Sequence, residues 1–419
     1  MNAKRTVAVL MALAMGAAAC SGSPKSAAPI RVGAIYPLTG SQARGGGIDE
    51  FRGVKLAADI VNRAGGVGGR PVRLVPVDVP GTDAVPEAIG RLRGQGVRLL
   101  LGSYGSTISK LAGALASRRG MLFWETGAVG EMASAGAGRL SFRVAPSGSV
   151  LGRSAIEFVT RRLAPMLHRS ADSLRFAVAK VDDEYGGGVG SGAIHEVRAL
   201  GVHLAGAVTY DPDELDAAAV VGRIAAMHPD VLFVSSYLQD GIELRKEMVR
   251  RHLNLLASIG TSSSYCMPMF GRALGRDAVG LFASDKPDAD SIAPEGLRPD
   301  ARSLLDEAQR LYRRRYSQEM DAPALAGFSA AWVLFARIMP AANGGSPRKV
   351  AAAARNTTLP RGALPNGSGL QFGAPGTTEA GANLRAASVI WEWTGVRQRA
   401  VVWPQAFATQ PIRVLPLAG

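Results

Sequence analysis

Polar and aromatic residues that could bind a small molecule stand directly after several predicted strands. They occur at Thr39-Gly40, from Ser103 to Thr107, from Glu125 to Val129, from Asp182 to Tyr185, and at Tyr237 and Ser262. In open parallel sheets, ligands bind beyond the carboxyl ends of the strands, where helix N-termini and free backbone amides converge. These loops therefore favour non-covalent binding of a small solute that carries a carboxylate or another oxygen-rich group.

Sequence motifs give little support to enzymatic chemistry. No G-x-S-x-G nucleophile elbow occurs, and the five histidines lack the spacing of zinc ligands. Gly188, Gly190 and Ala193 satisfy a relaxed dinucleotide-binding fingerprint, but that motif alone is weak. The alternative is a glycine-rich helix start that lets the backbone approach a ligand or the opposite lobe. We expect no catalytic residues, no metal and no cofactor, and an exported hydrolase is the less favoured alternative.

The elements that must position these loops alternate between short apolar runs and longer amphipathic stretches. We expect strands at 30–37, 71–78, 98–102, 121–125, 140–144, 174–181, 203–209, 230–236, 256–260 and 279–284. Helical patterns lie between them at 49–64, 83–95, 107–119, 149–167, 188–200, 214–227 and 239–252. This alternation predicts an α/β fold with two Rossmann-like lobes and parallel sheets covered on both faces.

Past residue 286 the pattern changes. Helices are expected at 300–316, 322–343 and 346–356, followed by two late strands at 386–393 and 399–403 that contain tryptophans. These strands need a sheet to join, so we expect them to return to an earlier lobe, which makes the lobes discontinuous in sequence. We assign residues 29–147 and 287–365 to lobe 1, and residues 148–286 and 366–419 to lobe 2.

Composition is that of a folded chain rather than a nucleic-acid-binding one. The 419 residues are 47% hydrophobic and 20% charged, which suits two or three lobes with substantial cores. The net charge is +14, but the basic residues are scattered, and Arg313-Arg314-Arg315 is their longest run. Because no stretch interleaves them with stacking aromatics, we expect no nucleic acid partner.

The first residues are typical of an exported protein. Lys4 and Arg5 precede an apolar run from Val7 to Ala19, which is too short to cross a hydrocarbon core of about 30 Å and is typical of a secretory signal. We expect residues 1–19 to be a signal peptide and residues 20–29 to be a lipidated Cys20 with its tether.

The expected lipidation rests on a resemblance. Ala17-Ala18-Ala19-Cys20 resembles the lipobox of bacterial lipoproteins, although that family prefers Leu where this chain has Ala17. The alternative is cleavage at a small-residue site beside an unmodified Cys20. With Cys20 lipidated, Cys266 has no partner, so we expect no intrachain disulfide.

Several motifs carry a wider resemblance. They are Ile30 to Gly40 (IRVGAIYPLTG), Arg52 to Asp59 (RGVKLAAD), Asn62 to Arg70 (NRAGGVGGR), Leu101 to Ser106, Tyr185-Gly186, Asn366 to Phe372 and Val401 to Pro404. From about residue 30 to 408 the chain resembles the solute-binding proteins of branched-chain amino-acid type ABC importers. The resemblance implies a type I periplasmic-binding fold, with two α/β lobes, three connecting strands and a ligand cleft that closes by hinge motion.

The resemblance also implies roles for individual residues. Ser106 would bind the ligand's carboxylate, helped by backbone amides around Gly127, Ala128 and Val129, and by the helix that starts near Thr107. Tyr185 and Tyr237 would cover the ligand from lobe 2. The alternatives are that Ser106 only caps the helix and that either tyrosine packs at the rim.

Three departures from the family pattern bear on the ligand. Gly45 stands where the amino-acid binders have an aromatic residue, Ser147-Gly148-Ser149 replaces an acidic residue, and Ser262 falls where a glutamate neutralises the ligand's ammonium group. A buried ammonium without a carboxylate costs several kcal/mol. Glu125, Asp183 or Glu184 could supply that charge, or the ligand could be an amide, a urea-like molecule or a small carboxylate.

These observations lead to one functional expectation. The chain is expected to be a monomeric, extracytoplasmic solute receptor of an ABC importer, lipid-anchored to the bacterial cell membrane and docking on a permease there. Its ligand would be a small polar molecule such as an amino acid, an amide or a small carboxylate. The alternative is a sensing lobe that passes its ligand to a membrane receptor.

Overall fold

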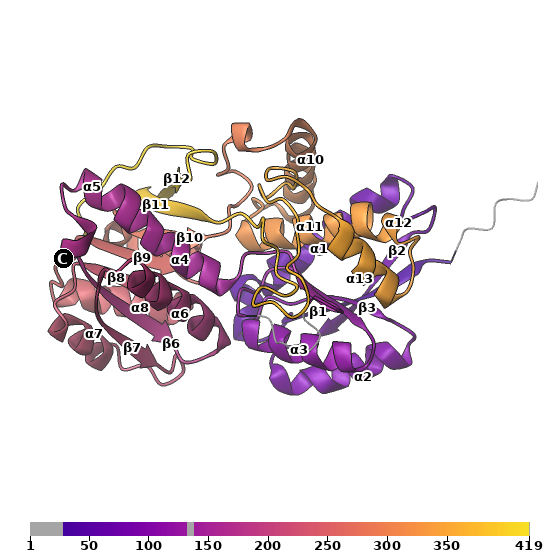
Figure 1. Ribbon diagram of the computed structural model, residues 1–419, viewed down its shortest axis with the longest axis horizontal. Helices are drawn as coiled ribbons and strands as arrows, with labels where there is room; N and C mark the ends of the chain where they lie inside the picture. Colours follow the sequence, from indigo (N-terminus) through magenta and orange to yellow (C-terminus); the bar gives the residue numbers. More distant parts are fainter. Residues whose placement is uncertain (1–27, 132–137, 419) are drawn as a thin grey trace, which may run out of the picture.

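The computed structural model describes residues 28–131 and 138–418, and it places them in two lobes (Figure 1). Each lobe has its own sheet with helices packed on it. The predicted α/β fold with two lobes is confirmed. The predicted signal peptide and Cys20 lie outside the described residues.

The first lobe contains a five-stranded parallel sheet in the order β2-β1-β3-β4-β5. Its strands are β1 Ile30–Tyr36, β2 Val72–Asp78, β3 Leu99–Gly102, β4 Leu122–Glu125 and β5 Ser141–Arg143. Strands β3 and β4 are apolar along most of their length and buried throughout, as expected where helices cover both faces. Because all five strands are parallel, their carboxyl ends meet at one edge of the sheet.

The second lobe contains a seven-stranded sheet in the order β12-β11-β10-β9-β8-β6-β7. Its strands are β6 Arg175–Val181, β7 His203–Tyr210, β8 Val231–Ser235, β9 Ala257–Thr261, β10 Phe282–Asp285, β11 Val389–Gly395 and β12 Gln398–Trp403. Strand β11 pairs antiparallel with β10, and β12 pairs antiparallel with β11. The prediction that the late strands return to an earlier sheet is confirmed, and Trp391 and Trp393 are buried there.

Helices cover both sheets. On the first lobe they are α1 Ile48–Arg63, α2 Val85–Gly94, α3 Ser106–Arg118, α10 Pro299–Tyr316, α11 Ala322–Val333, α12 Met339–Ala341 and α13 Pro347–Asn356. On the second lobe they are α4 Gly148–Phe158, α5 Ala164–Met166, α6 Glu184–Ala199, α7 Ala217–Ala226, α8 Leu238–Arg250 and α9 Pro268–Leu274.

Helix α11 is the core helix of the first lobe. The apolar run Ala322–Ala341 has the length and composition to cross a membrane, but 83% of its most apolar window is buried inside the protein. It packs closely against α1, since a Cβ atom on Gly53 would lie 2.0 Å from the Ala324 carbonyl oxygen and one on Gly327 would lie 2.1 Å from the Glu50 carbonyl oxygen. The run is therefore explained by packing against α1.

Helix α6 begins earlier than its sequence pattern predicts. We expected it at 188–200, but it starts at Glu184, and Asp183 caps it by accepting a hydrogen bond from the Gly186 N–H at 2.8 Å. Gly188, Gly190 and Ala193 therefore lie inside a helix rather than in a loop that could hold a phosphate. Gly192 of the same helix allows close packing within the second lobe, because a Cβ atom on it would lie 2.4 Å from the Cα of Ser149 at the start of α4.

The chain passes between the two lobes after β5, after β10 and before β11. The part of the chain just before β11 packs on the first lobe, where Phe372 contacts Trp124 and Phe142 with ring centroids 5.3 and 4.9 Å apart. This packing differs from the assignment of residues 366–419 to lobe 2, because the apolar ring of Phe372 is buried against the first sheet before the chain crosses. The exact lobe boundaries stay a prediction.

Candidate functional site

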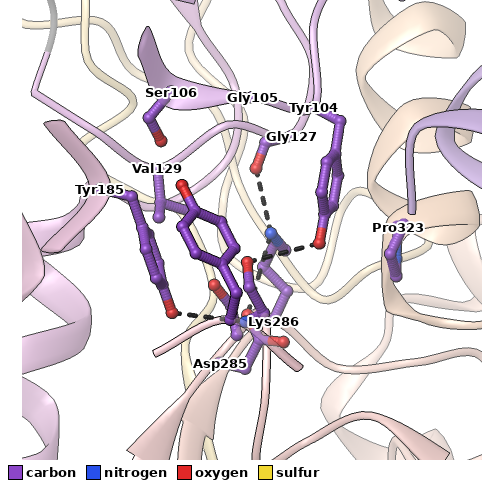
Figure 2. A pocket seen from close by; sticks show the side chains of 12 residues that line it. Tyr104, Gly105, Ser106, Gly127, Val129, Tyr185, Asp285, Lys286 and Pro323 are labelled. Carbon is purple, nitrogen blue, oxygen red and sulfur yellow. Dashed lines mark hydrogen bonds and ion pairs between the residues drawn. The ribbon is translucent and has the colours of Figure 1, made fainter. Parts of the chain in front are cut away.

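A cavity lies between the lobes, at the carboxyl ends of the parallel strands. It is lined by Tyr104, Gly105, Ser106, Gly127, Val129, Tyr185, Tyr237, Ser262, Ser263, Asp285, Lys286 and Pro323 (Figure 2). Six of these residues were expected from the sequence. Thr107, Ala128 and Glu125 were expected as well, but they are not among the lining residues.

Ser106 forms part of the first lobe's wall. Strand β3 ends at Gly102 and α3 begins at Ser106, with Gly105 as the N-cap residue. The idea that Ser106 is only a cap is therefore wrong: it is the first residue of the helix, and its Oγ accepts a hydrogen bond from the Gly130 N–H at 2.9 Å. The hydroxyl proton of Ser106 can still be donated to a solute. Thr107 is exposed to solvent.

The loop after β4 is organised around Glu125. One carboxylate oxygen of Glu125 accepts hydrogen bonds from the N–H groups of Gly127 and Ala128, both at 2.8 Å, and the other lies 3.4 Å from Arg143 Nε. Burial raises the pKa of Glu125, although Arg143 and the two amides act in the opposite direction. Two of the three amides expected to meet a ligand carboxylate are thus already occupied by the protein's own side chain.

The second lobe contributes two neighbouring tyrosines. The ring centroids of Tyr185 and Tyr237 are 5.2 Å apart. The Tyr185 hydroxyl lies 2.6 Å from Thr261 Oγ1 and accepts a hydrogen bond from the Ser263 N–H at 3.3 Å, and the Tyr237 hydroxyl donates to Asp183. Burial raises the pKa of both phenols, so they are neutral and can cover a solute without adding charge.

The three carboxylates suggested as counter-charges for an ammonium group are all engaged elsewhere. Glu125 is bound to its own loop, and Asp183 caps α6 and accepts from Tyr237. Glu184 pairs with Lys110 of α3 at 2.5 Å, across the gap between the lobes. None of the three is among the residues that line the cavity.

The sequence analysis did not identify Asp285 and Lys286, although they also stand at the carboxyl end of a parallel strand. Asp285 is the last residue of β10 and Lys286 begins the second crossing, so both stand at the carboxyl end of a parallel strand. Both are buried, with 1% and 4% of their surface exposed. Lys286 Nζ reaches into the first lobe and donates to the Gly127 carbonyl oxygen at 3.0 Å (Figure 2).

Tyr104 lies beside the first loop of the first lobe, next to Gly45. Its ring lies beside the glycines of the first loop, because a Cβ atom on Gly45 would be 3.8 Å from the ring and one on Gly46 would be 2.4 Å from it. The Tyr104 hydroxyl donates to Ser263 Oγ at 3.3 Å, which links the two lobes. The ring of Tyr104 therefore lines this side of the cavity.

Together these contacts describe a closed cleft. Tyr104 with Ser263, Lys110 with Glu184, and Lys286 with Gly127 connect the first lobe to the second lobe and to the second crossing. Hydroxyls, one carboxylate and one ammonium group face a small enclosed space. This arrangement suits recognition of a polar solute by hydrogen bonds, with aromatic rings excluding water.

The fold and cavity agree with a comparison with known families. Residues 29–388 match the sequence model of a family described as periplasmic binding protein. The chain belongs to this family, which makes it an extracytoplasmic solute-binding protein.

Three individual proteins illustrate the similarity. The chain is 25% identical over 389 residues to the Leu/Ile/Val-binding protein homolog 8 of Brucella suis, a match that covers 92% of this chain and 93% of that one. The leucine-binding protein LivK of Thermotoga maritima has a similar structure, with a TM-score of 0.74 and 17% identity over 89% of this chain and 97% of that one. A solute-binding protein of R. palustris solved with benzoate gives a TM-score of 0.70 and 16% identity, covering 93% and 99% of the two chains. The two structural matches support the fold.

Proposed function

We propose that this chain is the solute-binding receptor of an ABC importer and that it holds one small polar solute between its lobes. The observation that carries the proposal is the single cavity that Ser106 of the first lobe shares with Tyr185 and Tyr237 of the second. The class of solute is an amino acid, an amide or a small carboxylate. The similar proteins include one named as a Leu/Ile/Val-binding protein homolog, one leucine-binding protein and one protein solved with benzoate, which fits this range.

The proposed mechanism is closure without a chemical step. In the open protein the solute meets Ser106 and the N-terminal end of α3, whose partial positive charge favours an anionic group. Closure then brings Tyr185 and Tyr237 over it. Because the solute contacts both lobes only in the closed state, it binds that state more tightly and shifts the population toward it. The closed form then docks on a membrane permease.

A ligand panel tests this proposal. Amino acids, their amides and small carboxylates, including L-leucine and benzoate, are screened by thermal unfolding, and hits are examined by solution scattering. We expect at least one compound to raise the melting temperature and to make a monomeric protein more compact. A panel without one stabilising compound would contradict the receptor function, and turnover of a hit would indicate an enzyme instead.

Two adjacent residues provide a matched pair of variants. Ser106→Ala removes a hydroxyl that lines the cavity, whereas Thr107→Ala removes one that is exposed outside it. A hydrogen bond to a charged group contributes about 1.5–3 kcal/mol, so Ser106→Ala is expected to weaken binding by about tenfold or more. Thr107→Ala is expected to leave the affinity within about twofold. Equal effects of the two substitutions would argue against solute binding at Ser106.

We also propose that the receptor is anchored through a lipid on Cys20. The support is the lipobox-like sequence Ala17-Ala18-Ala19-Cys20 after an apolar run. Cells that express the chain with radiolabelled palmitate should label the wild type but not Cys20→Ala. Globomycin, which blocks the lipoprotein signal peptidase, should leave the wild type with its signal peptide. Labelling that survives in Cys20→Ala would refute the anchor.

A further inference from the structure

Asp285 has hydrogen-bonding capacity that the described part of the chain does not use. Its side chain lines the cavity and only 1% of the residue is exposed. Oδ2 accepts from the Cys266 thiol at 2.8 Å, but that single proton also faces the Ser262 carbonyl oxygen at 2.9 Å. Oδ1 has no hydrogen-bond partner among residues 28–131 and 138–418. A buried carboxylate oxygen in this state is costly unless a ligand satisfies it.

The neighbouring Lys286 does not fill this role. Its Nζ is 3.8 Å from Asp285 Oδ1, which is too far for a hydrogen bond, and it donates to the Gly127 carbonyl oxygen instead. Lys286 has three protons and this one hydrogen-bond partner among the described residues. Both residues therefore line the same cavity, and each has hydrogen-bonding capacity that the described residues do not use (Figure 2).

The charges of this pair restrict the solute that fits. A solute with only an amine would satisfy Asp285 but meet the positive charge of Lys286. A solute with only a carboxylate would satisfy Lys286 and leave Asp285 Oδ1 buried without a partner. A solute with an ammonium group and a carboxylate close together satisfies both and leaves the net charge of the cavity unchanged.

We propose that Asp285 is a ligand-binding residue that accepts a hydrogen bond from a protonated amine of the solute, with the solute's carboxylate held by Lys286 and Ser106. This assignment rests on the proposed receptor function. It places the counter-charge for the amine at the end of β10 rather than at Ser262, where the sequence resemblance led us to look for it. Among the described residues that line the cavity, Asp285 is the one carboxylate.

Matched probes separate this assignment from the receptor function. Each amino acid of the panel, with L-leucine as the first example, is compared with the carboxylic acid that lacks only its amine, which for leucine is 4-methylpentanoate. Affinities are measured by titration calorimetry on the full mature chain. The wild type is expected to prefer the tightest-binding amino acid over its deaminated partner by about tenfold or more.

Asp285→Asn tests the residue itself. Asparagine has the same shape but no negative charge, so the variant is expected to lose about tenfold in affinity for the amino acid and to change its affinity for the deaminated acid by less than about twofold. Asp290→Asn, which alters an exposed aspartate on the same crossing, is the control and should behave as the wild type. Circular dichroism and melting curves confirm that each variant is folded.

Two results would overturn the assignment. If the wild type binds a deaminated acid as tightly as its amino acid, or if folded Asp285→Asn keeps the preference, Asp285 does not bind an amine, while the receptor function stands. The comparison of an amino acid with its deaminated acid uses only the wild type, so it tests the assignment even if Asp285→Asn does not fold. If no probe of the panel binds the wild type, the receptor function fails and this assignment fails with it.

Discussion

One ion pair between the lobes allows the stability of the closed state to be changed without altering the residues that line the cavity. Lys110 of α3 and Glu184 of α6 approach to 2.5 Å across the gap, and neither lines the cavity between the lobes. If closure is what traps the solute, reversing one of these charges must weaken binding although no solute contact has changed.

The expected size follows from their exposure. The side chains are 46% and 34% exposed, and exposed pairs of this kind contribute about 0.2–1 kcal/mol. Lys110→Glu removes that attraction and adds a repulsion of similar size, so it should destabilise the closed state by about 1 kcal/mol. The apparent Kd should then rise about fivefold. Salt should reduce the effect, because the Debye length falls from about 10 Å at 0.1 M to about 3 Å at 1 M.

The assay is titration calorimetry with the tightest-binding compound of the ligand panel, at low and high salt. Lys110→Glu and Glu184→Lys should each weaken binding at low salt, and the double reversal should restore it to within about twofold of the wild type. Lys246→Glu is the control, because this exposed lysine makes the same change in net charge and has no ion pair among the described residues. If the single reversals leave Kd unchanged at low salt, or if the double reversal does not restore it, the lobes do not meet at this pair when the solute is bound.

Three further predictions concern stability and reactivity. Gly192→Ala should destabilise the protein by about 2 kcal/mol in chemical unfolding, since the added Cβ would meet the backbone of α4. Gly187→Ala in the same helix has open space and should be neutral or stabilising by up to about 1 kcal/mol. Equal effects of the two substitutions would contradict the close packing of the two helices. Burial raises the pKa of Asp321 to about 7 from 3.8, so the folded state loses stability as pH rises through this range. Between pH 5 and pH 8, Asp321→Asn should therefore gain about 1–2 kcal/mol of unfolding free energy relative to the wild type. A difference in unfolding free energy between the two proteins that does not change with pH would show that Asp321 does not titrate in this range. Burial also raises the pKa of the Cys266 thiol, and only 2% of the residue is exposed, so it should react with a thiol reagent only after unfolding. Rapid labelling of the native protein would contradict the burial of Cys266.

The positions of the strands and helices could be predicted because they depend on local patterns. The bounds of the five strands of the first sheet were predicted to within one residue, since most of these strands are short and mainly apolar runs. Helix α6 was misplaced because its first turn, from Glu184 to Gly187, contains two glycines and resembles a loop. The decisive feature there was the capping carboxylate of Asp183, which the sequence also contains.

The site was predicted less completely, because it depends on contacts between distant segments. The rule that ligands bind at the carboxyl ends of parallel strands led to Ser106, Tyr185 and Tyr237, and the same rule applied to the strand at 279–284 would have led to Asp285. Local patterns could not show that Tyr104 fills the space beside Gly45, since 59 residues separate them.

The amides of Gly127 and Ala128 illustrate a second limit. They were expected to be free for a ligand, but the carboxylate of Glu125, two and three residues earlier in the chain, accepts from both. Which partner satisfies a backbone amide depends on the rotamer of a side chain, and rotamers are selected by packing. The presence of Arg143 on the next strand, 3.4 Å from Glu125, holds that carboxylate inside the lobe rather than in the cleft.

Two of the contacts between the lobes stabilise the closed state only weakly. The Tyr104 to Ser263 hydrogen bond is long at 3.3 Å, and the Lys110 to Glu184 pair is largely exposed, so each stabilises closure by at most about 1 kcal/mol. Against them stands Asp285, whose Oδ1 has no partner among the described residues, at a cost of about 1–3 kcal/mol. The buried Lys286 to Gly127 hydrogen bond adds about 1.5–3 kcal/mol in favour of closure. The opposing contributions are of similar size, so the closed and open forms of the empty protein should lie within a few kcal/mol of each other. A solute that satisfies Asp285 removes the opposing contribution as well as adding its own contacts, and this is why a small molecule is able to shift the whole population toward the closed form.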